Sequence, residues 1–294
     1  MIKFQKIVVV VGPTATNKTK LAITIAKEIN GEIINADAFQ VYKELNIGVN
    51  KPTLQELKEA TFHLVGNVSI LDKWDIKRFQ DLANHTINKI YQKNKVPILV
   101  GGSHLYVDAL INNYDLNESN ERTNEFTNLS NDELKNELSK FNIVLANKIG
   151  SNRKRLIRAL QIMKSGHKID SKNKSFYGPL YIFCNKPRNQ LYEDINKRVD
   201  LMIKNGWFEE VNKLISDFPN YIELNAFKAI GYLDIAQGLT HPNKGIDIPK
   251  IKQQVRRYAK RQLTWIRHHY MNAYEFNQNN INETIKVIKK WLLK

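Results

Sequence analysis

Short apolar runs and helically spaced apolar residues alternate along the first hundred positions of this chain. The runs lie at Ile7–Val11, at residues 32–36 and at residues 96–100, each flanked by polar residues or glycine. Runs of this length are typical of strands buried on both faces of a parallel sheet. Between them, residues 21–29 and 76–92 carry apolar side chains at helical spacing. Strands that alternate with helices predict an α/β fold with a parallel sheet.

The middle of the chain leaves this pattern, and the later part returns to it. Residues 112–128 are polar and acidic, and residues 130–164 have helical periodicity with Ser130 as the expected N-cap. Strand character returns at residues 179–184. Longer helices are expected after it, at residues 191–205, 207–215 and 251–270. The expected domains are a core in two parts, residues 1–111 and 176–294, and a small inserted helical domain, residues 112–175.

A phosphate-binding loop is predicted where the first strand ends. The octapeptide Gly12–Thr19 (GPTATNKT) matches the pattern G-x-x-x-x-G-K-[ST], except that Asn17 stands at the second glycine position. Backbone N–H groups at a helix N-terminus bind phosphate oxygens, Lys18 would neutralise them, and the Thr19 hydroxyl can reach a bound Mg²⁺. The expected phosphate-binding residues are Gly12, Thr14, Ala15, Thr16, Asn17, Lys18 and Thr19. Taken alone, such a loop indicates ATP or GTP, or else a strand–turn–helix corner that binds nothing.

A carboxylate is predicted beside this loop. Asp37 directly follows the strand at residues 32–36. In an open parallel sheet the ligand crevice lies outside the carboxyl ends of the strands, so Asp37 should face the same crevice as the phosphate loop. The strand at residues 96–100 likewise ends in a backbone-permissive loop, Gly101–Ser103. An Asp at a strand end is also common as a turn or helix cap, so position alone leaves both interpretations open.

The charge of the chain points to a polyanionic partner. Lys and Arg number 45 against 29 Asp and Glu, which gives a formal net charge of +16 and a sequence pI of about 9.6. A coding bias toward Asn, Lys and Ile is an alternative source of this excess. No acid occurs between Phe141 and Ile169, or within the expected helix at 251–270. Aromatic residues interleave with the basic ones of that helix, which favours nucleic acid over a membrane surface because its apolar stripe is needed for the core.

Other classes of protein are excluded or disfavoured by composition. The single cysteine, Cys184, excludes an internal disulfide and a cysteine-rich zinc site, and it fits a reducing cytosol. No histidine spacing of the H-E-x-x-H kind is present. No apolar run approaches the roughly 20 residues needed to cross a bilayer. We expect a soluble cytoplasmic protein without a membrane partner.

Several sequence blocks occur in the order found in one known family. They are GPTATNKT from Gly12, NADAFQVY from Asn35, IGVNKP from Ile47, ILVGGSHLY from Ile98, RKRLIRAL from Arg153, AIGY from Ala229 and RYAKRQLTW from Arg257. Together they resemble the tRNA dimethylallyltransferases, enzymes that prenylate an adenine beside the anticodon. The resemblance extends over about residues 6–270. Blocks in this order are far more specific than any one of them.

The resemblance implies a fold and an activity. The fold would be a P-loop NTPase-like parallel sheet with flanking helices and a small inserted helical domain. The activity would transfer a dimethylallyl group from dimethylallyl diphosphate to N6 of adenine 37 in tRNAs that read codons beginning with U, releasing diphosphate. The phosphate loop would then hold the prenyl diphosphate rather than ATP, with Mg²⁺ at Thr19. The implied partners are the donor and the tRNA anticodon stem-loop, and we expect a monomer.

The resemblance also implies roles for individual residues. Asp37 would accept a proton from the adenine N6 amine, Ser103 would donate a hydrogen bond where the family usually has Thr, and Arg198 would face the diphosphate. The target base must leave its stack to reach them. The implied tRNA-binding residues are Asp37, Ala38, Phe39, Gln40, Asn152, Arg153, Lys154, Arg155, Leu156, Arg257, Lys260, Arg261 and Gln262.

The chain departs from the family pattern at a few positions, and these leave alternatives open. Asn17 replaces a glycine, Ala38 replaces the usual Ser, and Val49 replaces the usual Thr. Asn is the non-glycine residue most tolerant of positive φ, so the loop can keep its shape. One alternative is a catalytically impaired tRNA-binding homologue. The other is an adenylate prenyltransferase, which would use a free nucleotide and would not need the two basic segments.

Overall fold

The computed structural model describes residues 5–116, 126–164, 166, 175–241, 243, 245–277 and 280–294. The chain divides into two compact units, one made of residues 1–111 and 175–294 and the other of residues 112–174. The polar segment 112–128, at the start of the expected inserted domain, lies partly outside the described residues.

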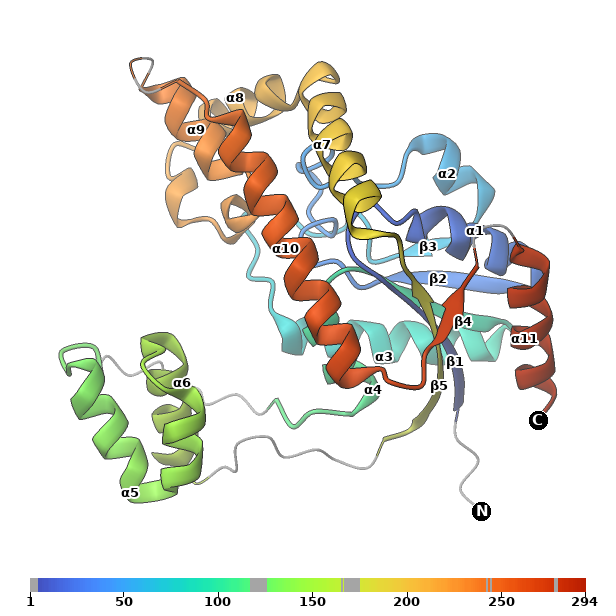
Figure 1. Cartoon of the computed structure of the whole chain (residues 1–294), viewed down its shortest axis with the longest axis horizontal. Helices are drawn as coiled ribbons and strands as arrows, with labels where there is room; N and C mark the ends of the chain where they lie inside the picture. The colour runs from blue at the N-terminus through green and yellow to red at the C-terminus, as the bar shows by residue number, and fades with distance from the viewer. Residues whose placement is uncertain are drawn as a thin grey trace. The chain divides into compact units, whose positions relative to one another are not determined.

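A parallel six-stranded sheet forms the centre of the larger unit, as Figure 1 shows. Its strands are β1 (Gln5–Val11), β2 (Gly31–Asn35), β3 (Phe62–His63), β4 (Val96–Val100), β5 (Tyr177–Cys184) and β6 (Tyr274–Phe276). They are ordered β3-β2-β4-β1-β5-β6, and every pair is parallel. Because β1 lies inside the sheet, with Val9 opposite Leu99 on one side and Tyr181 on the other, the loop after it opens at the middle of the carboxyl edge. The predicted α/β, P-loop NTPase-like fold is confirmed.

Helices cover both faces of this sheet. They are α1 (Lys18–Glu28), α2 (Leu54–Glu59), α3 (Ile76–Gln92), α4 (His104–Ile111), α7 (Arg188–Lys204), α8 (Trp207–Asp217), α9 (Tyr232–Thr240), α10 (Ile248–His269) and α11 (Ile281–Leu293). The helix predicted at residues 76–92 is confirmed by α3. The helix predicted at 251–270 begins earlier, at Ile248, because the Asp247 side chain accepts the Lys250 N–H and caps that end. The sequence reading did not predict α2, α9, β6 or α11.

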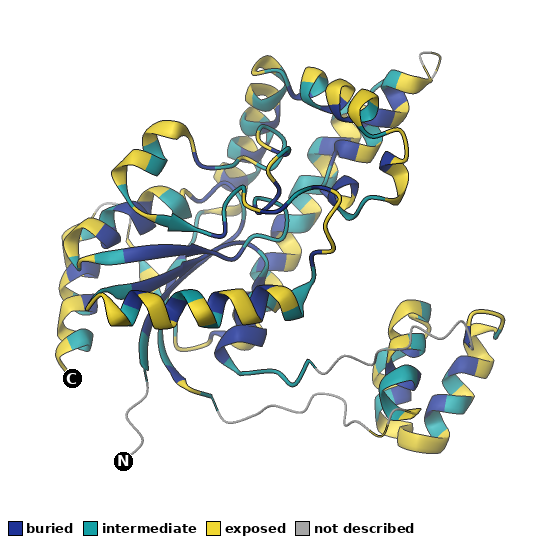
Figure 2. Cartoon of the chain, turned by 180° about the vertical axis from the view of Figure 1, so that it is seen from behind, coloured by how far each residue is buried: buried dark blue, intermediate teal, exposed yellow. Residues whose placement is uncertain are grey.

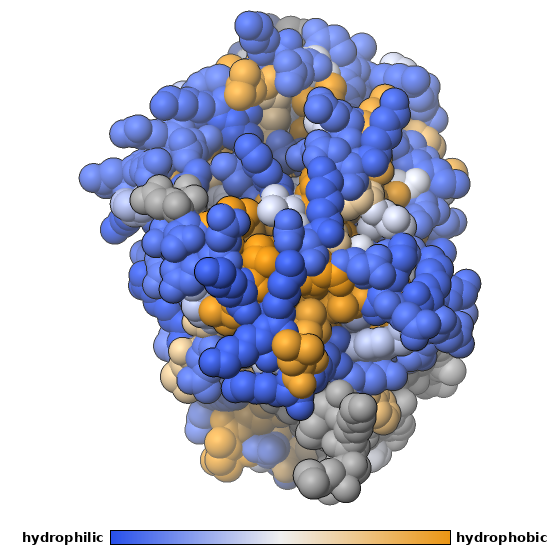
Figure 3. Space-filling view, turned by 90° about the vertical axis from the view of Figure 1, so that its right-hand side faces the viewer, coloured by the Kyte–Doolittle hydropathy of each residue, from blue (hydrophilic) through white to orange (hydrophobic). Residues whose placement is uncertain are grey.

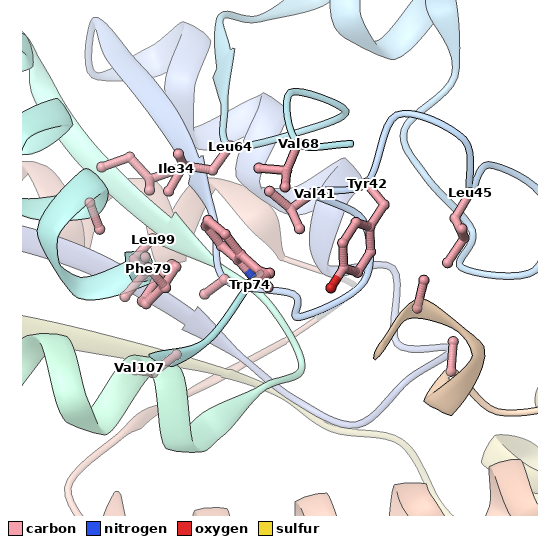
Figure 4. Close-up of a cluster of buried hydrophobic side chains, with 14 of the residues drawn as sticks. Ile34, Val41, Tyr42, Leu45, Leu64, Val68, Trp74, Phe79, Leu99 and Val107 are labelled. Carbon is pink, nitrogen blue, oxygen red and sulfur yellow. The ribbon is translucent and has the colours of Figure 1, made fainter. Parts of the chain in front are cut away.

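Alternation along β1 divides the core into two layers. Val8 and Val10 belong to a cluster with α1 and α11, whereas Val9 belongs to a cluster with α3, α4 and the later helices. The central strands β1, β2 and β4 are largely buried on both faces, and the outer sides of the helices are exposed (Figure 2). Figure 4 shows part of the larger cluster, where Trp74 and Phe79 lie close to Leu99 of the sheet. Full burial of a Val, Leu, Ile or Phe side chain contributes about 1.5–3 kcal/mol, so these layers hold the strand ends in place.

One face of the molecule is mainly polar. Figure 3 shows one face on which hydrophilic residues predominate around a smaller hydrophobic area. Within the described part of the chain, no helix has both the length and the apolar character needed to cross a membrane.

The smaller unit is helical. It contains α5 (Asn131–Ile149) and α6 (Arg153–Lys164), which pack through a cluster that includes Leu138 and Leu160. Ser130 caps α5 as predicted, because its hydroxyl accepts the Glu133 N–H while the Glu133 carboxylate accepts the Ser130 N–H. The backbone at Asn142 is non-helical and kinks α5.

Candidate active site

The phosphate loop lies between β1 and α1, and its shape depends on close packing. A Cβ on Gly12 would lie 2.5 Å from the Cys184 carbonyl oxygen of β5, so only glycine fits there. Asn17 adopts φ 58° and ψ 30°, the left-handed conformation for which the usual pattern has glycine. The prediction that Asn can take a positive φ here is confirmed. The residue is exposed and borders the cavity beside the loop.

Two cations border the loop. The Lys18 ammonium donates to the Pro13 carbonyl oxygen at 2.7 Å, and burial lowers the pKa of Lys18 to about 8. The nearby Arg198 guanidinium, from α7, lowers the same pKa further, while Asp37 raises it. Arg198 donates to the Thr14 hydroxyl oxygen at 3.3 Å, and burial also lowers the pKa of Arg198. Concentrated positive charge that is short of solvent is a strong anion site.

Asp37 lies at the end of β2, held by its own turn. Its Oδ1 accepts the backbone N–H groups of Phe39 at 2.9 Å and Gln40 at 3.3 Å. Burial raises the pKa of Asp37, although these two hydrogen bonds and Lys18 act in the opposite direction. Asp37 is therefore both a turn cap and a carboxylate next to the loop. The two interpretations that its position left open are compatible.

The turn after β4 brings Ser103 next to Asp37. Gly101 lies against the backbone of β2, because a Cβ there would be 2.3 Å from the Ala36 carbonyl group. The Ser103 hydroxyl oxygen accepts the Ala38 N–H at 3.0 Å. A Cβ on Gly102 would lie 3.8 Å from Asp37 Oδ2, so this second carboxylate oxygen points toward the Gly102 side of the turn.

Side chains of α10 form hydrogen bonds with both the phosphate loop and the Gly101–Ser103 turn. Gln262 Nε2 and the Tyr258 hydroxyl both donate to the Gly102 carbonyl oxygen at 2.9 Å. Gln262 Oε1 accepts the Thr14 N–H at 2.8 Å. The Gln262 side chain is 3 % exposed, so it belongs to the interior of the site rather than to the outer surface of the helix.

Two adjoining cavities meet at Asp37 and Arg198. One, of about 400 Å³, is lined by the phosphate loop from Thr14 to Thr19 together with these two residues. The other, of about 490 Å³, is also lined by Asp37 and Arg198 and has many apolar side chains in its wall. Those apolar residues include Phe39, Val199, Met202, Trp207, Val255 and Trp265. The arrangement can hold an anion in the first cavity and an uncharged planar or branched group in the second, with a carboxylate at the junction.

The predicted RNA-binding residues of the smaller unit are of two kinds. Lys154 and Arg155 are exposed at the start of α6. Arg153 instead donates to the carbonyl oxygens of Thr127 and Leu129, and Leu156 is fully buried among apolar residues. Asn152 accepts the Arg155 N–H and caps the helix. In this structure, therefore, Leu156 serves the core and cannot present its side chain to RNA.

The basic residues of α10 are also of two kinds, exposed and half-buried. Arg257, Lys260 and Arg261 are exposed, as expected. In contrast, Lys252 pairs with Asp200 and Arg256 donates to Asn196, both on α7. Both side chains are half-buried where α10 packs against α7.

Sequence reasoning missed Asp108, near the second cavity, and gave Gln262 a different role. Asp108 is 1 % exposed, and it accepts hydrogen bonds from Trp265 and Tyr270. An acid inside the apolar stretch of α4 was a signal that could have drawn attention to it. Gln262 was assigned to the RNA surface, and its bridge between two turns had no sequence signal.

Comparisons with known proteins agree with this geometry. The family model described as IPP transferase matches residues 40–269. A tRNA dimethylallyltransferase of Malacoplasma penetrans is 42% identical over 300 residues, which cover 98% of this chain and 98% of that protein. A solved tRNA isopentenylpyrophosphate transferase of Bacillus halodurans superposes with a TM-score of 0.72 at 32% identity, covering 97% of this chain and 96% of that one. A eukaryotic dimethylallyltransferase solved acting on tRNA has a TM-score of 0.83 at 26% identity, covering 97% of this chain and 78% of the other.

Proposed function

The chain belongs to the IPP transferase family, and we propose that it transfers a dimethylallyl group from dimethylallyl diphosphate to N6 of adenine 37 in tRNA. The tRNAs would be those that read codons beginning with U, and diphosphate would be released. One observation carries the proposal: Asp37 stands between a cavity lined by Lys18 and Arg198 and a larger, mainly apolar cavity. A reaction that joins an adenine amine to an allylic carbon and expels diphosphate needs that order of groups.

The smaller cavity would hold the diphosphate. Loop N–H groups and Lys18 would bind its oxygens, and Arg198 would reach them from α7. Negative charge grows on the leaving oxygen as the C–O bond breaks, so fixed positive groups around it lower the barrier. Lys18 donates to the Pro13 carbonyl oxygen in the free protein, and this hydrogen bond would be exchanged for one to the ligand.

Mg²⁺ is the expected cofactor, and the residues present fit it. The Thr19 hydroxyl lines the phosphate-loop cavity and is a hard oxygen donor. No cluster of three or more His, Cys, Asp or Glu side chains that could hold a metal occurs among the described residues, so substrate oxygens and water would supply the other ligands. When bound, the ion would neutralise charge on the diphosphate.

Asp37 would act as the proton acceptor. Its Oδ1 is engaged by two backbone N–H groups, which leaves Oδ2, on the Gly102 side, for the N6 amine. The N6 nitrogen forms its bond to the allylic carbon, the C–O bond breaks, the electron pair leaves with diphosphate, and an N6 proton passes to Asp37. Ser103, beside it, would donate its hydroxyl hydrogen to the substrate.

Exposed basic residues would bind the tRNA. Arg257, Lys260 and Arg261 on α10 would contact phosphates, and Lys154 and Arg155 would do so from the smaller unit. The segment Ala38–Gln40 follows Asp37, and Phe39 lines the larger cavity, where it would contact the extruded base. Asn152, Arg153, Leu156 and Gln262 would support these contacts from behind. We further propose that the protein acts as a monomer in the cytoplasm.

A transfer assay tests the proposal. Purified protein, Mg²⁺ and radiolabelled dimethylallyl diphosphate would be incubated with tRNA, with AMP or with no acceptor. We expect label on tRNA alone. Label on AMP alone would favour an adenylate prenyltransferase, and tight tRNA binding without transfer would favour an impaired homologue with a defective phosphate loop. The exposed basic segments favour tRNA over a free nucleotide.

A further inference from the structure

Trp265 forms part of the wall of the 490 Å³ cavity, on α10. Two contacts fix its indole ring. The indole N–H donates to Asp108 Oδ2 at 2.9 Å, and the His269 imidazole stacks on the ring with centroids 4.4 Å apart and planes 18° apart. The remaining part of the ring borders the cavity. A planar aromatic surface of set orientation is thus available to whatever enters.

Asp108 holds this arrangement together from α4. Besides the Trp265 N–H, its carboxylate accepts the Tyr270 hydroxyl at 2.7 Å and pairs with His269 Nδ1 at 2.7 Å. The Asp108 side chain is 1 % exposed and its partner Tyr270 is buried, whereas His269 is partly open to solvent. Helix α4 begins at His104, directly after Ser103, so Asp108 ties the Ser103 turn to the C-terminal part of α10.

The position of Trp265 on α10 indicates which substrate meets it. Arg261 lies one helical turn before Trp265, lines the same cavity, and is exposed. Leu105, another wall residue, is 47% exposed. Trp265 therefore lies toward the open, basic side of the cavity. Arg198, Val199 and Met202 line it from α7, where Arg198 also borders the phosphate-loop cavity.

We propose that Trp265 stacks on the target adenine and is a specificity-determining residue of the tRNA site. Asp108 and His269 are positioning residues that hold the indole ring for this contact. A purine drawn out of its stack loses its neighbours on both faces, and an aromatic side chain replaces one of them. The inference rests on the proposed function, because it needs tRNA as the substrate.

Abasic RNA gives a direct test. Binding of the anticodon stem-loop would be measured by fluorescence anisotropy for the wild type, Trp265→Leu and Trp265→Phe, with adenine 37 present or replaced by an abasic residue. With adenine present, we expect Trp265→Leu to weaken binding by about tenfold to a hundredfold and Trp265→Phe by much less. With the abasic RNA, the three proteins should bind equally. An equal loss on both RNAs would overturn the stacking contact.

Steady-state kinetics test the positioning residue. Asp108→Ala should raise KM for tRNA by about tenfold and leave KM for dimethylallyl diphosphate within about twofold, because it loosens the indole without touching the phosphate loop. Trp291→Leu is the matched control, since Trp291 packs with α1 on the opposite face of the sheet. A rise in both KM values would overturn the role of Asp108. If the wild type modifies no tRNA, the proposed function fails. If the wild type modifies tRNA and Trp265→Leu binds and modifies it equally well, only this inference fails.

Discussion

The Gln262 side-chain oxygen accepts the Thr14 backbone N–H at 2.8 Å, although the two residues are 248 positions apart. The amide end of the same side chain donates to the Gly102 carbonyl oxygen, next to Ser103. One residue of the helix that carries the exposed Arg257 and Arg261 thus contacts both the phosphate loop and the Gly101–Ser103 turn. We infer that the positions of the donor and of the tRNA are set relative to each other through Gln262.

Replacing Gln262 should damage the donor site first. In Gln262→Leu the Thr14 N–H loses its partner, whereas the Gly102 oxygen keeps Tyr258. We expect the free energy of unfolding to fall by about 1–3 kcal/mol, and KM for dimethylallyl diphosphate to rise more than KM for tRNA. Urea unfolding and steady-state kinetics measure both. Gln254→Leu is the control, since Gln254 lies on the same helix and contacts Asp234 away from the cavities. Equal donor KM values for the two variants would contradict the link.

The Asp37→Asn variant should separate the chemistry from the turn. Its side-chain oxygen can still accept the Phe39 and Gln40 N–H groups, but an amide takes no proton near neutral pH. We expect kcat to fall by about 10²–10⁴, with tRNA affinity within about threefold of wild type. In the wild type, kcat/KM should fall on the acid side, because burial raises the pKa of Asp37 and its protonated form accepts nothing. Normal turnover by Asp37→Asn would exclude Asp37 as the base.

Because Lys18 loses its charge at alkaline pH, the affinity for the donor should fall there. Burial lowers the pKa of Lys18 to about 8, so the free protein carries this charge below that pH and loses it above. A diphosphate binds the charged form, so its affinity should be level below about pH 8 and fall by up to about tenfold per pH unit above it. Isothermal titration with inorganic diphosphate measures the curve. In Lys18→Arg the bend should disappear, since guanidinium stays protonated. If affinity still falls above about pH 8 in this variant, the pH dependence belongs to a titratable group other than Lys18.

Local patterns explain which parts of the site could be predicted. The phosphate loop and Asp37 follow apolar runs that can only be buried strands, and the geometry of parallel sheets then brings the strand ends together. The N-cap at Ser130 follows from the same kind of local signal. The strand β6, in contrast, has only three residues, too few to show a period.

Contacts between distant helices could not be predicted. Gln262 lies three residues after Ala259 and four before Ile266, so helical spacing places it on the buried face of α10. Its partners, the Gly102 carbonyl oxygen and the Thr14 N–H, are tertiary contacts that no local pattern indicates. The Leu156 side chain is buried, as its helical spacing indicates, so the tRNA role that the family block implies would be one of support from the core.

Substitutions at Asn17 should distinguish conformation from side-chain chemistry. Its φ of 58° is easily adopted by glycine and costs a β-branched residue about 1–2 kcal/mol. Because the Asn17 side chain is exposed, Asn17→Gly should keep kcat/KM for the donor within about threefold of wild type. Asn17→Val should lower it by about tenfold or more and also reduce the melting temperature. A large gain of activity in Asn17→Gly would instead show that the natural asparagine impairs the loop.

Arg257 and Arg261 should contribute a salt-dependent part of tRNA affinity. Both are exposed on α10, and each phosphate contact releases condensed counterions from the RNA. In the double variant Arg257→Ala/Arg261→Ala, the slope of log K against log salt should become shallower by about 1.5, and KM for dimethylallyl diphosphate should stay within about twofold. Filter binding at several salt concentrations measures the slope. Lys286→Ala/Lys290→Ala is the control with the same change in net charge, since both lysines are exposed on α11, which packs on the other face of the sheet from α3 and α4. If the two double variants shift the slope equally, the effect belongs to net charge and α10 is not the tRNA surface.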